Sequence, residues 1–196
     1  MRLSIVVPVF NEKPFVAEVF RRIASSGLSG LECEIIVVDD GSTDGCGELL
    51  QKLTGGPLRE GFLALGLSDE VSPIDEPIDF RLIVHEKNYG KGAALRAGFA
   101  VATGDLILVQ DADLEYDPKD YLKLLAPLLD GRADVVYGSR FAGGEPHRVL
   151  YFWHALGNRI LTQLSNAFTN LNLSDMECCY KVFRRQVLQQ IKLEED

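Results

Sequence analysis

The chain has 196 residues, which suits one domain that buries roughly 70% of the surface its unfolded chain exposes. Hydrophobic residues at 46% and charged residues at 25% are ordinary for a soluble globular protein. The net charge of -9 argues against a general nucleic-acid binder, whose affinity depends on phosphate neutralisation by Lys and Arg. We therefore expect no nucleic-acid partner.

Cysteine spacing and hydropathy indicate the compartment. Cys33, Cys46, Cys178 and Cys179 form no C-x-x-C pair and lack zinc spacing, so we expect reduced thiols in a cytosolic environment. The chain begins directly with a strand-like run and shows no secretory signal pattern. No apolar run approaches the roughly 20 residues that span a bilayer. We expect a cytoplasmic protein, either soluble or peripheral at the cytoplasmic face of a membrane.

The first part of the chain alternates strand and helix patterns. Residues 3–9 are β-branched and apolar, and a helical pattern follows through residues 16–23. Residues 34–38 predict a second buried strand, and a helix is expected around residues 49–53. Residues 54–79 contain several glycines, prolines and acids and fit this alternation less well. We interpret them as an insertion.

The alternation resumes after the insertion. Residues 80–84 predict a strand, residues 90–101 a helix whose small residues allow close packing on a sheet, and residues 106–109 a buried strand. A helix over residues 119–129 and a strand over residues 133–137 complete the series.

Two later segments depart from this order, with a helix expected over residues 150–168 and a final piece around residues 178–183. The alternation predicts an α/β fold with a mainly parallel central sheet and helices on both faces. Since no linker or internal repeat interrupts the chain, we expect residues 1–196 to form a single domain.

Three carboxylates follow the strand at residues 106–109. Asp111, Asp113 and Glu115 stand at alternate positions beyond its carboxyl end, where open α/β sheets bind ligands. Such oxygen groups suit a divalent cation bridged to an anion. An alternative interpretation is a solvated acidic turn that caps the helix after Pro118.

Five short motifs, each at or just after a predicted strand end, resemble glycosyltransferase family 2 enzymes of GT-A fold. The similarity is closest to the branch of dolichyl-phosphate mannose synthases and bacterial polyprenyl-phosphate glycosyltransferases. It covers almost the whole chain apart from the insertion. The motifs are Val7-Pro8-Val9-Phe10-Asn11-Glu12, Val38-Asp39-Asp40-Gly41-Ser42, Asn88-Tyr89-Gly90-Lys91-Gly92, Asp111-Ala112-Asp113 and Gly138-Ser139-Arg140.

The resemblance implies a nucleotide pocket. Pro8, Phe10 and Glu12 would line it, with Glu12 accepting hydrogen bonds from the ribose or base, although Phe10 could equally be a core residue. Asp39 offers an acceptor for the ring N–H of uracil or guanine. The alternative is that an acid of this turn merely caps the next helix, a role we expect of Asp40 or Asp44 more than of Asp39.

The donor diphosphate would be held with Mg²⁺ or Mn²⁺, which prefer oxygen ligands. Asp113 is the first expected ligand, Asp111 would bind the metal or the ribose, and Glu115 is an additional candidate. Ala112 lies between the two aspartates in the motif. Lys91 could touch phosphate or remain solvated.

The acceptor would be held by basic side chains. Arg140, Arg148 and Lys181 lie in segments that the family uses around the donor diphosphate and the acceptor phosphate. Asp175 could position the acceptor, or an acid near it could act as a base. A phosphate acceptor is already ionised near pH 7 and needs no strong base, whereas a sugar hydroxyl does.

Residues 151–154 are aromatic and follow Arg148. They suit a membrane interface, and burial of the start of the following helix would explain them equally well. Members of the resembled family continue beyond the point that corresponds to residue 196, so the resemblance implies either a catalytic fragment or a short form.

The predicted function is an inverting, metal-dependent transfer of a hexose from a GDP- or UDP-sugar to an acceptor, with polyprenyl phosphate favoured. Transfer to a sugar hydroxyl in glycan assembly is one alternative. A nucleotidyltransferase is another, although residues 8–12 replace the Gly-rich, basic loop expected there. An inactive nucleotide-sugar-binding module is the third.

Overall fold

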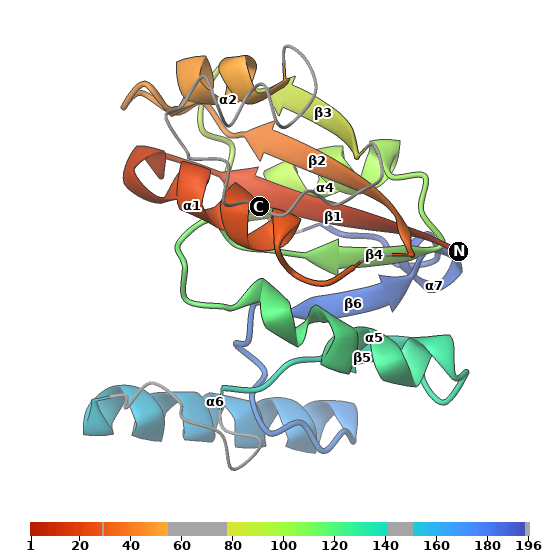
Figure 1. The fold of residues 1–196 in the computed structure, drawn as a ribbon. Coiled ribbons are helices and arrows are strands. Elements are labelled where there is room, and N and C mark those ends of the chain that lie inside the picture. The colour runs from red at the N-terminus through yellow and green to blue at the C-terminus, as the bar shows by residue number, and fades with distance from the viewer. Residues whose placement is uncertain (29, 55–77, 141–150, 195–196) are drawn as a thin grey trace.

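The structure is a computed structural model that describes residues 1–28, 30–54, 78–140 and 151–194. The predicted insertion over residues 54–79 lies almost entirely outside these ranges. Within them, the chain forms one central sheet with helices packed against it (Figure 1).

The described sheet has six strands in the order β3-β2-β1-β4-β6-β5. β1 pairs in parallel with β2 and β4, and β2 pairs in parallel with β3, while β6 is antiparallel to both β4 and β5. The predicted, mainly parallel sheet is therefore confirmed. The strands are β1 (Arg2–Val9), β2 (Glu32–Asp39), β3 (Asp79–Val84), β4 (Leu106–Val109), β5 (Val135–Tyr137) and β6 (Lys181–Arg184).

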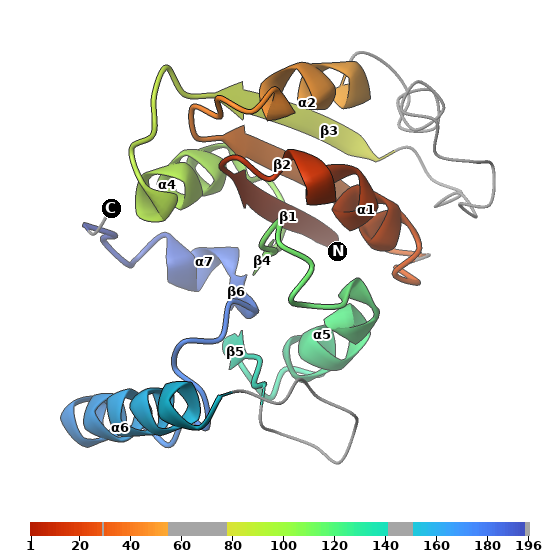
Figure 2. The same ribbon diagram turned by 90° about the vertical axis from the view of Figure 1, so that its left-hand side faces the viewer.

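Helices cover both faces of the sheet, as the alternation predicts. Figure 2 shows α4 and α7 on one side and α1, α2 and α5 on the other. A short 3-10 turn, Pro118–Asp120, precedes α5. The helices are α1 (Lys13–Ala24), α2 (Cys46–Thr54), α4 (Lys91–Val101), α5 (Tyr121–Leu129), α6 (Phe152–Thr169) and α7 (Arg185–Leu188).

Side-chain alternation along β1 divides the core into two layers. Leu3, Ile5 and Val7 belong to the buried cluster that includes α1, α2 and α5, whereas Val6 belongs to the cluster under α4 and α7. Gly98 lets α4 approach closely, because a Cβ there would lie 2.4 Å from Val6 Cγ1.

A buried carboxylate, that of Glu34, connects the N-terminal ends of β1, β2 and β4. These ends lie at the opposite edge of the sheet from the carboxyl ends of the same strands. Glu34 is fully buried and accepts hydrogen bonds from the Thr103 N–H at 2.6 Å and the Gly104 N–H at 3.1 Å. Arg2 Nη2 lies 3.3 Å from Glu34 Oε2. This network links β1 and β2 to the segment that enters β4.

The helix α6 stands apart from the sheet in both views (Figures 1 and 2). Asn158 and Thr162 are its buried residues, and many of its apolar side chains are exposed. Trp153 is 75% exposed and Phe168 is 88% exposed. The described structure therefore leaves a wide apolar face of α6 uncovered.

Candidate functional site

The loops after β1, β2, β3 and β4 meet at one edge of the sheet. β1 lies between β2 and β4, so the chain order reverses at β1, the position where open α/β sheets form a ligand crevice. A cavity of about 270 Å³ lies there. Its lining residues are Pro8, Val9, Phe10, Glu12, Asp40, Asn88, Lys91, Ala94, Asp111, Ala112 and Asp113.

Side-chain hydrogen bonds tie the loop after β1 to the loop after β2. Asn11 adopts a left-handed conformation with φ of 56°, and its Oδ1 accepts the Thr43 N–H at 2.8 Å. The Asn11 N–H donates to Ser42 Oγ at 3.0 Å. Asp44 accepts from the Lys13 and Cys46 N–H groups at 2.9 Å each, so it caps the start of α2. These bonds fix the wall of the cavity that carries Phe10 and Glu12.

Asp40 fixes the part of the cavity wall that is formed by the loop between β3 and α4. Its buried carboxylate lies 2.6 Å from His85 Nδ1 and accepts hydrogen bonds from the backbone of Tyr89 and from the Gly90 N–H at 2.9 Å. Because Gly90 is the N-cap residue of α4, Asp40 holds the loop that delivers Lys91. Of the two acids expected to cap the next helix, α2, Asp44 has that role, whereas Asp40 serves the start of α4.

Lys91 and Asp111 form an ion pair across the cavity. Lys91 Nζ lies 2.6 Å from the Asp111 carboxylate, and the two side chains are 53% and 17% exposed. Burial alone would lower the pKa of Lys91, but the charge of Asp111 outweighs it and the pKa is raised. The lysine therefore stays charged and neutralises one carboxylate of the cavity.

The pKa of Glu12 indicates that the cavity carries negative charge. Partial burial raises the pKa of Glu12, and the nearby carboxylates of Asp113, Asp44 and Asp111 raise it further. The cavity thus concentrates negative charge that a bound cation would relieve.

These oxygen groups fit a hard divalent cation such as Mg²⁺ or Mn²⁺. Asp111 and Asp113 line the same cavity as Glu12, and such cations commonly take one or two carboxylates together with substrate phosphates. Within the ranges given above, no three acidic, cysteine or histidine groups form a metal cluster by themselves. The donor set therefore fits a cation that completes its shell with a phosphate-bearing ligand.

Glu115, the third predicted ligand, is placed differently. It is not among the residues that line the cavity, and its Oε1 lies 3.9 Å from Arg140 Nη1. Its backbone N–H donates to Asp113 Oδ1 at 3.0 Å, which closes a small turn. Glu115 thus connects the Asp111 segment with Arg140.

Arg140 and Asp175, predicted near the acceptor, contact each other. Arg140 Nε donates to Asp175 Oδ2 at 2.7 Å and Nη2 to Oδ1 at 2.9 Å, and Asn158 Nδ2 also donates to Oδ1 at 3.2 Å. Burial alone would raise the pKa of Asp175, but its bonds to Arg140 dominate and lower it. Asp175 is therefore an ionised partner of Arg140 and a poor base.

None of the remaining predicted residues is among the described residues that line the cavity. Lys181 Nζ donates to the Cys178 carbonyl and lies 5.3 Å from the Tyr137 ring centroid, outside the cavity lining. Asp39 is 2% exposed, and its Oδ1 accepts the Ser42 N–H at 3.0 Å. Arg148 lies outside the described residues.

Phe10 is 42% exposed at the cavity, so the alternative that it is a core residue is wrong. Two contributions were not expected from the sequence. Asp40 bonds the loop after β3 although it follows β2, and the Lys91–Asp111 pair joins the start of α4 to the loop after β4. Asn88 belongs to the family motif of residues 88–92, so its place in the cavity lining could have been predicted.

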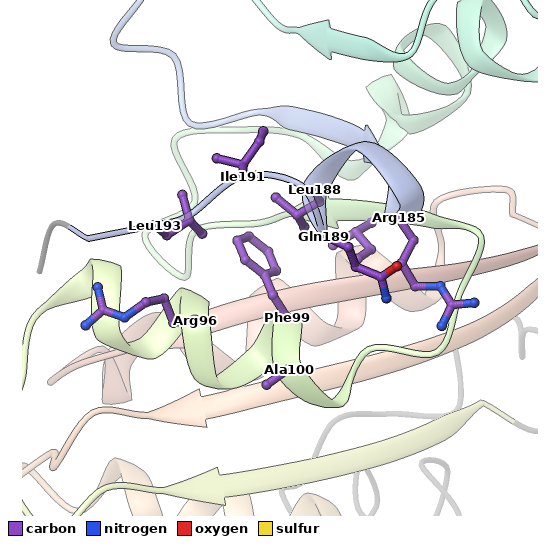
Figure 3. A pocket seen from close by; sticks show the side chains of 9 residues that line it. Arg96, Phe99, Ala100, Arg185, Leu188, Gln189, Ile191 and Leu193 are labelled. Atoms are coloured by element: carbon purple, nitrogen blue, oxygen red, sulfur yellow. The ribbon is translucent and has the colours of Figure 1, made fainter.

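A second cavity lies on the sheet face that carries α4, between α4 and the C-terminal segment. Figure 3 shows Phe99, Leu188 and Leu193 around it, with Arg96 and Arg185 at its margins. Its volume is also about 270 Å³, and no carboxylate is among the described residues that line it. Of these two cavities, the first is the one whose described lining offers carboxylates to a cation.

Comparison with known proteins identifies a family. The model of "Glycosyl transferase family 2" matches residues 4–192. Dodecaprenyl-phosphate galacturonate synthase of Rhizobium johnstonii is 32% identical over 194 residues, covering 98% of this chain and 51% of its own. Undecaprenyl-phosphate 4-deoxy-4-formamido-L-arabinose transferase of Pseudomonas aeruginosa is 29% identical, with 95% and 48% covered. The chain spans about half the length of these curated relatives.

Solved structures share the fold. Glucosyl-3-phosphoglycerate synthase from Mycobacterium tuberculosis, in complex with Mn²⁺, UDP-glucose and phosphoglyceric acid, has a TM-score of 0.62 at 22% identity, covering 96% of this chain and 58% of its own. S. aureus TarS in complex with UDP-GlcNAc has a TM-score of 0.60 at 22% identity, with 97% and 47% covered. The predicted GT-A fold is confirmed.

Proposed function

The chain belongs to glycosyl transferase family 2, and from this premise we propose that it transfers a hexose from a UDP- or GDP-sugar to a polyprenyl phosphate. The reaction would be metal-dependent and would invert the anomeric centre. We propose residues 1–196 as one catalytic domain, and its place of action as the cytoplasmic face of a membrane.

One observation carries the proposal, which is the convergence of Glu12, Asp111 and Asp113 on a cavity closed by Lys91. A nucleotide-sugar contains a diphosphate, and its negative charge would be repelled by these acids without a cation. Mg²⁺ or Mn²⁺ held by Asp111 and Asp113 would supply Lewis-acid stabilisation of the leaving diphosphate. Lys91 would exchange its bond to Asp111 for a phosphate oxygen.

The nucleotide would lie against the loops after β1 and β2. Exposed Phe10 offers a surface for the base or ribose, and Pro8 and Ala112 add apolar side chains to the cavity wall. Asp39 remains the proposed reader of a ring N–H, because its Oδ2 receives no hydrogen bond from the described residues.

The Arg140–Asp175 pair favours a phosphate acceptor. Both oxygens of Asp175 accept hydrogen bonds, and its pKa is lowered, so it is poorly suited to remove a proton from a sugar hydroxyl. A phosphate acceptor needs no such base. Arg140 has an Nη1 group directed to Glu115 at 3.9 Å, and we propose that this side of Arg140, with Lys181 and Arg148, attracts the acceptor phosphate.

The relatives support a lipid acceptor, since both carry a polyprenyl phosphate in their names. The described residues contain no helix long and apolar enough to cross a bilayer. The exposed apolar face of α6 offers a peripheral contact instead. Although the whole chain carries a net charge of -9, α6 contains no acidic residue, which reduces repulsion from anionic headgroups.

A transfer assay tests this proposal. The purified chain would be incubated with UDP- or GDP-hexoses, Mn²⁺ and a short polyprenyl phosphate in detergent, and the product would be identified by mass spectrometry. We expect a sugar joined to the lipid phosphate, and its loss in Asp113→Asn. Product formed only on an oligosaccharide acceptor would favour glycan assembly, and no product from any donor would contradict the proposed activity.

A further inference from the structure

Gln110, immediately before the first aspartate of the cavity, is held at both ends of its side chain. It directly follows β4, which ends at Val109, and is 1% exposed. Its Nε2 donates to the Asp111 carbonyl at 2.8 Å. Its Oε1 accepts hydrogen bonds from the hydroxyls of Tyr121 at 2.7 Å and Tyr180 at 2.8 Å. Few conformations satisfy all of these bonds together, so the amide is fixed.

The two tyrosines come from separate parts of the fold. Tyr121 begins α5 and is fully buried, while Tyr180 precedes β6 and is 4% exposed. Their rings meet edge to face with centroids 5.8 Å apart. Burial raises the pKa of both phenols above the ordinary value, so both remain hydrogen-bond donors at neutral pH. The position of Gln110 is thus set by α5 and β6 together.

The backbone that Gln110 restrains is under local strain. Leu114 has φ of 62°, a left-handed conformation that is unfavourable for a non-glycine residue. The bond from the Glu115 N–H to Asp113 Oδ1 holds the far side of the same turn. Such strain persists when the surroundings over-determine the conformation, and the Gln110 contact with Asp111 supplies that restraint at the near side.

We propose that Gln110, fixed by Tyr121 and Tyr180, is a positioning residue that directs the Asp111 and Asp113 carboxylates into the cavity. This proposal rests on the proposed function, because it makes Gln110 a determinant of divalent-cation affinity. When a group that hydrogen-bonds to a metal ligand and orients it is removed, the metal affinity typically falls tenfold to a hundredfold. Gln110 acts through Asp111 and does not contact the substrate.

A merely structural role predicts a different outcome. If the amide only fills a polar gap in the core, losing its donors lowers stability and leaves the cavity unchanged. The chain offers a matched control for that outcome. Tyr116 belongs to the same aromatic cluster, with its ring centroid 4.7 Å from that of Tyr180, but its hydroxyl accepts from the Cys179 N–H and does not bond Gln110.

The test compares the double variant Tyr121→Phe/Tyr180→Phe with Tyr116→Phe. Two quantities would be measured in each protein: amide hydrogen exchange over residues 111–115, and the Mn²⁺ concentration that gives half-maximal thermal stabilisation by UDP or GDP. We expect the double variant to exchange faster over residues 111–115 and to need about tenfold more Mn²⁺. Tyr116→Phe should match the wild type in both measurements.

Unchanged exchange in a folded double variant would overturn the positioning role, as would equal changes in Tyr116→Phe. Faster exchange with an unchanged Mn²⁺ midpoint would overturn its link to the cation. If the wild type shows no metal-dependent nucleotide binding, the proposed function fails, while exchange still decides whether Gln110 fixes the turn. Gln110→Leu, which removes the amide, should reproduce the result of the double variant.

Discussion

Arg140 and Asp175 form a two-point ion pair, with Nε 2.7 Å from Oδ2 and Nη2 2.9 Å from Oδ1. The Arg140 N–H donates to the same carboxylate at 3.1 Å. The Asp175 side chain is fully buried and accepts a hydrogen bond from Asn158 of α6, whereas the Arg140 side chain is 22% exposed and faces Glu115. The pair therefore connects a buried residue beside α6 to the surface near Glu115. One residue of the pair thus orients the other.

Asp175→Ala is expected to destabilise the protein by about 3 kcal/mol, because it leaves a largely buried guanidinium without its partner. Urea unfolding measures the change. The control is Asp130→Ala, which removes an exposed pair with Arg132 on the surface and should leave the unfolding midpoint unchanged. Equal midpoints for Asp175→Ala and wild type would show that the pair is not structural.

Acid should weaken the fold through Glu34. Burial alone would raise the pKa of Glu34, but hydrogen bonds from Ser4 and Thr103 outweigh it, and the pKa is lowered. A lowered folded-state pKa means that this stabilisation is present above the unfolded pKa of about 4.3 and is lost as the pH falls through the folded pKa.

The corresponding measurement follows the urea midpoint from about pH 6 down to about pH 3 in wild type and Glu34→Gln. The variant should be less stable at pH 6 and should lose less stability on acidification. Parallel curves for the two proteins would contradict the role of Glu34. Nucleotide binding at neutral pH should persist in Glu34→Gln, because Glu34 lies at the opposite end of the sheet from the cavity.

How far the sequence predicted this structure depended on the range of the interactions. The strand at residues 106–109 was predicted with its observed bounds, because four consecutive apolar residues lie between a glycine turn and an acidic turn. The antiparallel direction of β6 was not predicted, since no local pattern encodes which neighbour a strand will pair with.

The site followed the same rule. The functional roles of the site residues stay predictions. Val9, Asp40, Asn88 and Ala94 line the cavity without having been predicted as site residues, whereas Phe10, Glu12, Asp111 and Asp113 were predicted there because they follow strands at the same edge of the sheet. Their hydrogen-bond partners were not, because Arg140 and Asp175 lie 35 residues apart and Gln110 and Tyr180 lie 70 apart. Only the folded chain brings such groups together. Glu115 was predicted as an additional ligand, and the structure places its Oε1 3.9 Å from Arg140 Nη1 and outside the described cavity lining.

Lys91→Met should have opposite effects on two ligands. Because the variant lacks the positive charge of Lys91, the negative charge of Asp111 is no longer neutralised, and Mn²⁺ alone should bind more tightly. UDP or GDP with Mn²⁺ should bind about tenfold more weakly, because a charge-assisted bond to phosphate contributes roughly 1.5–3 kcal/mol. Calorimetric titration measures both affinities.

Lys87→Met is the matched control for that experiment. Lys87 lies in the same loop, 5.3 Å from the Tyr89 ring centroid, and does not line the cavity. Both affinities should equal those of the wild type. A uniform loss in Lys91→Met for metal and for nucleotide would indicate damage to the loop rather than loss of a phosphate contact.

The exposed face of α6 should bind lipid. Trp153→Ser and Phe168→Ser each remove an exposed aromatic residue from this face, and we expect each to reduce binding to vesicles of anionic phospholipid several-fold in a sedimentation assay. Leu122→Ser on α5, which removes another exposed apolar side chain of 48% exposure, is the control and should leave binding unchanged. If Trp153→Ser, Phe168→Ser and Leu122→Ser all bound the vesicles as strongly as the wild type, α6 would be excluded as the lipid contact.

The most direct test of the central claim is thermal stabilisation of the chain by UDP, GDP, ADP and CDP, each with Mn²⁺ and with a chelator. Ligand at about 100 times its dissociation constant stabilises a protein by ~2.7 kcal/mol, which gives a measurable shift in Tm. We predict a shift with UDP or GDP that requires Mn²⁺ and is lost in Asp113→Asn. No shift with any nucleotide, or a shift of equal size in the presence of chelator, would contradict a metal-dependent nucleotide-sugar site.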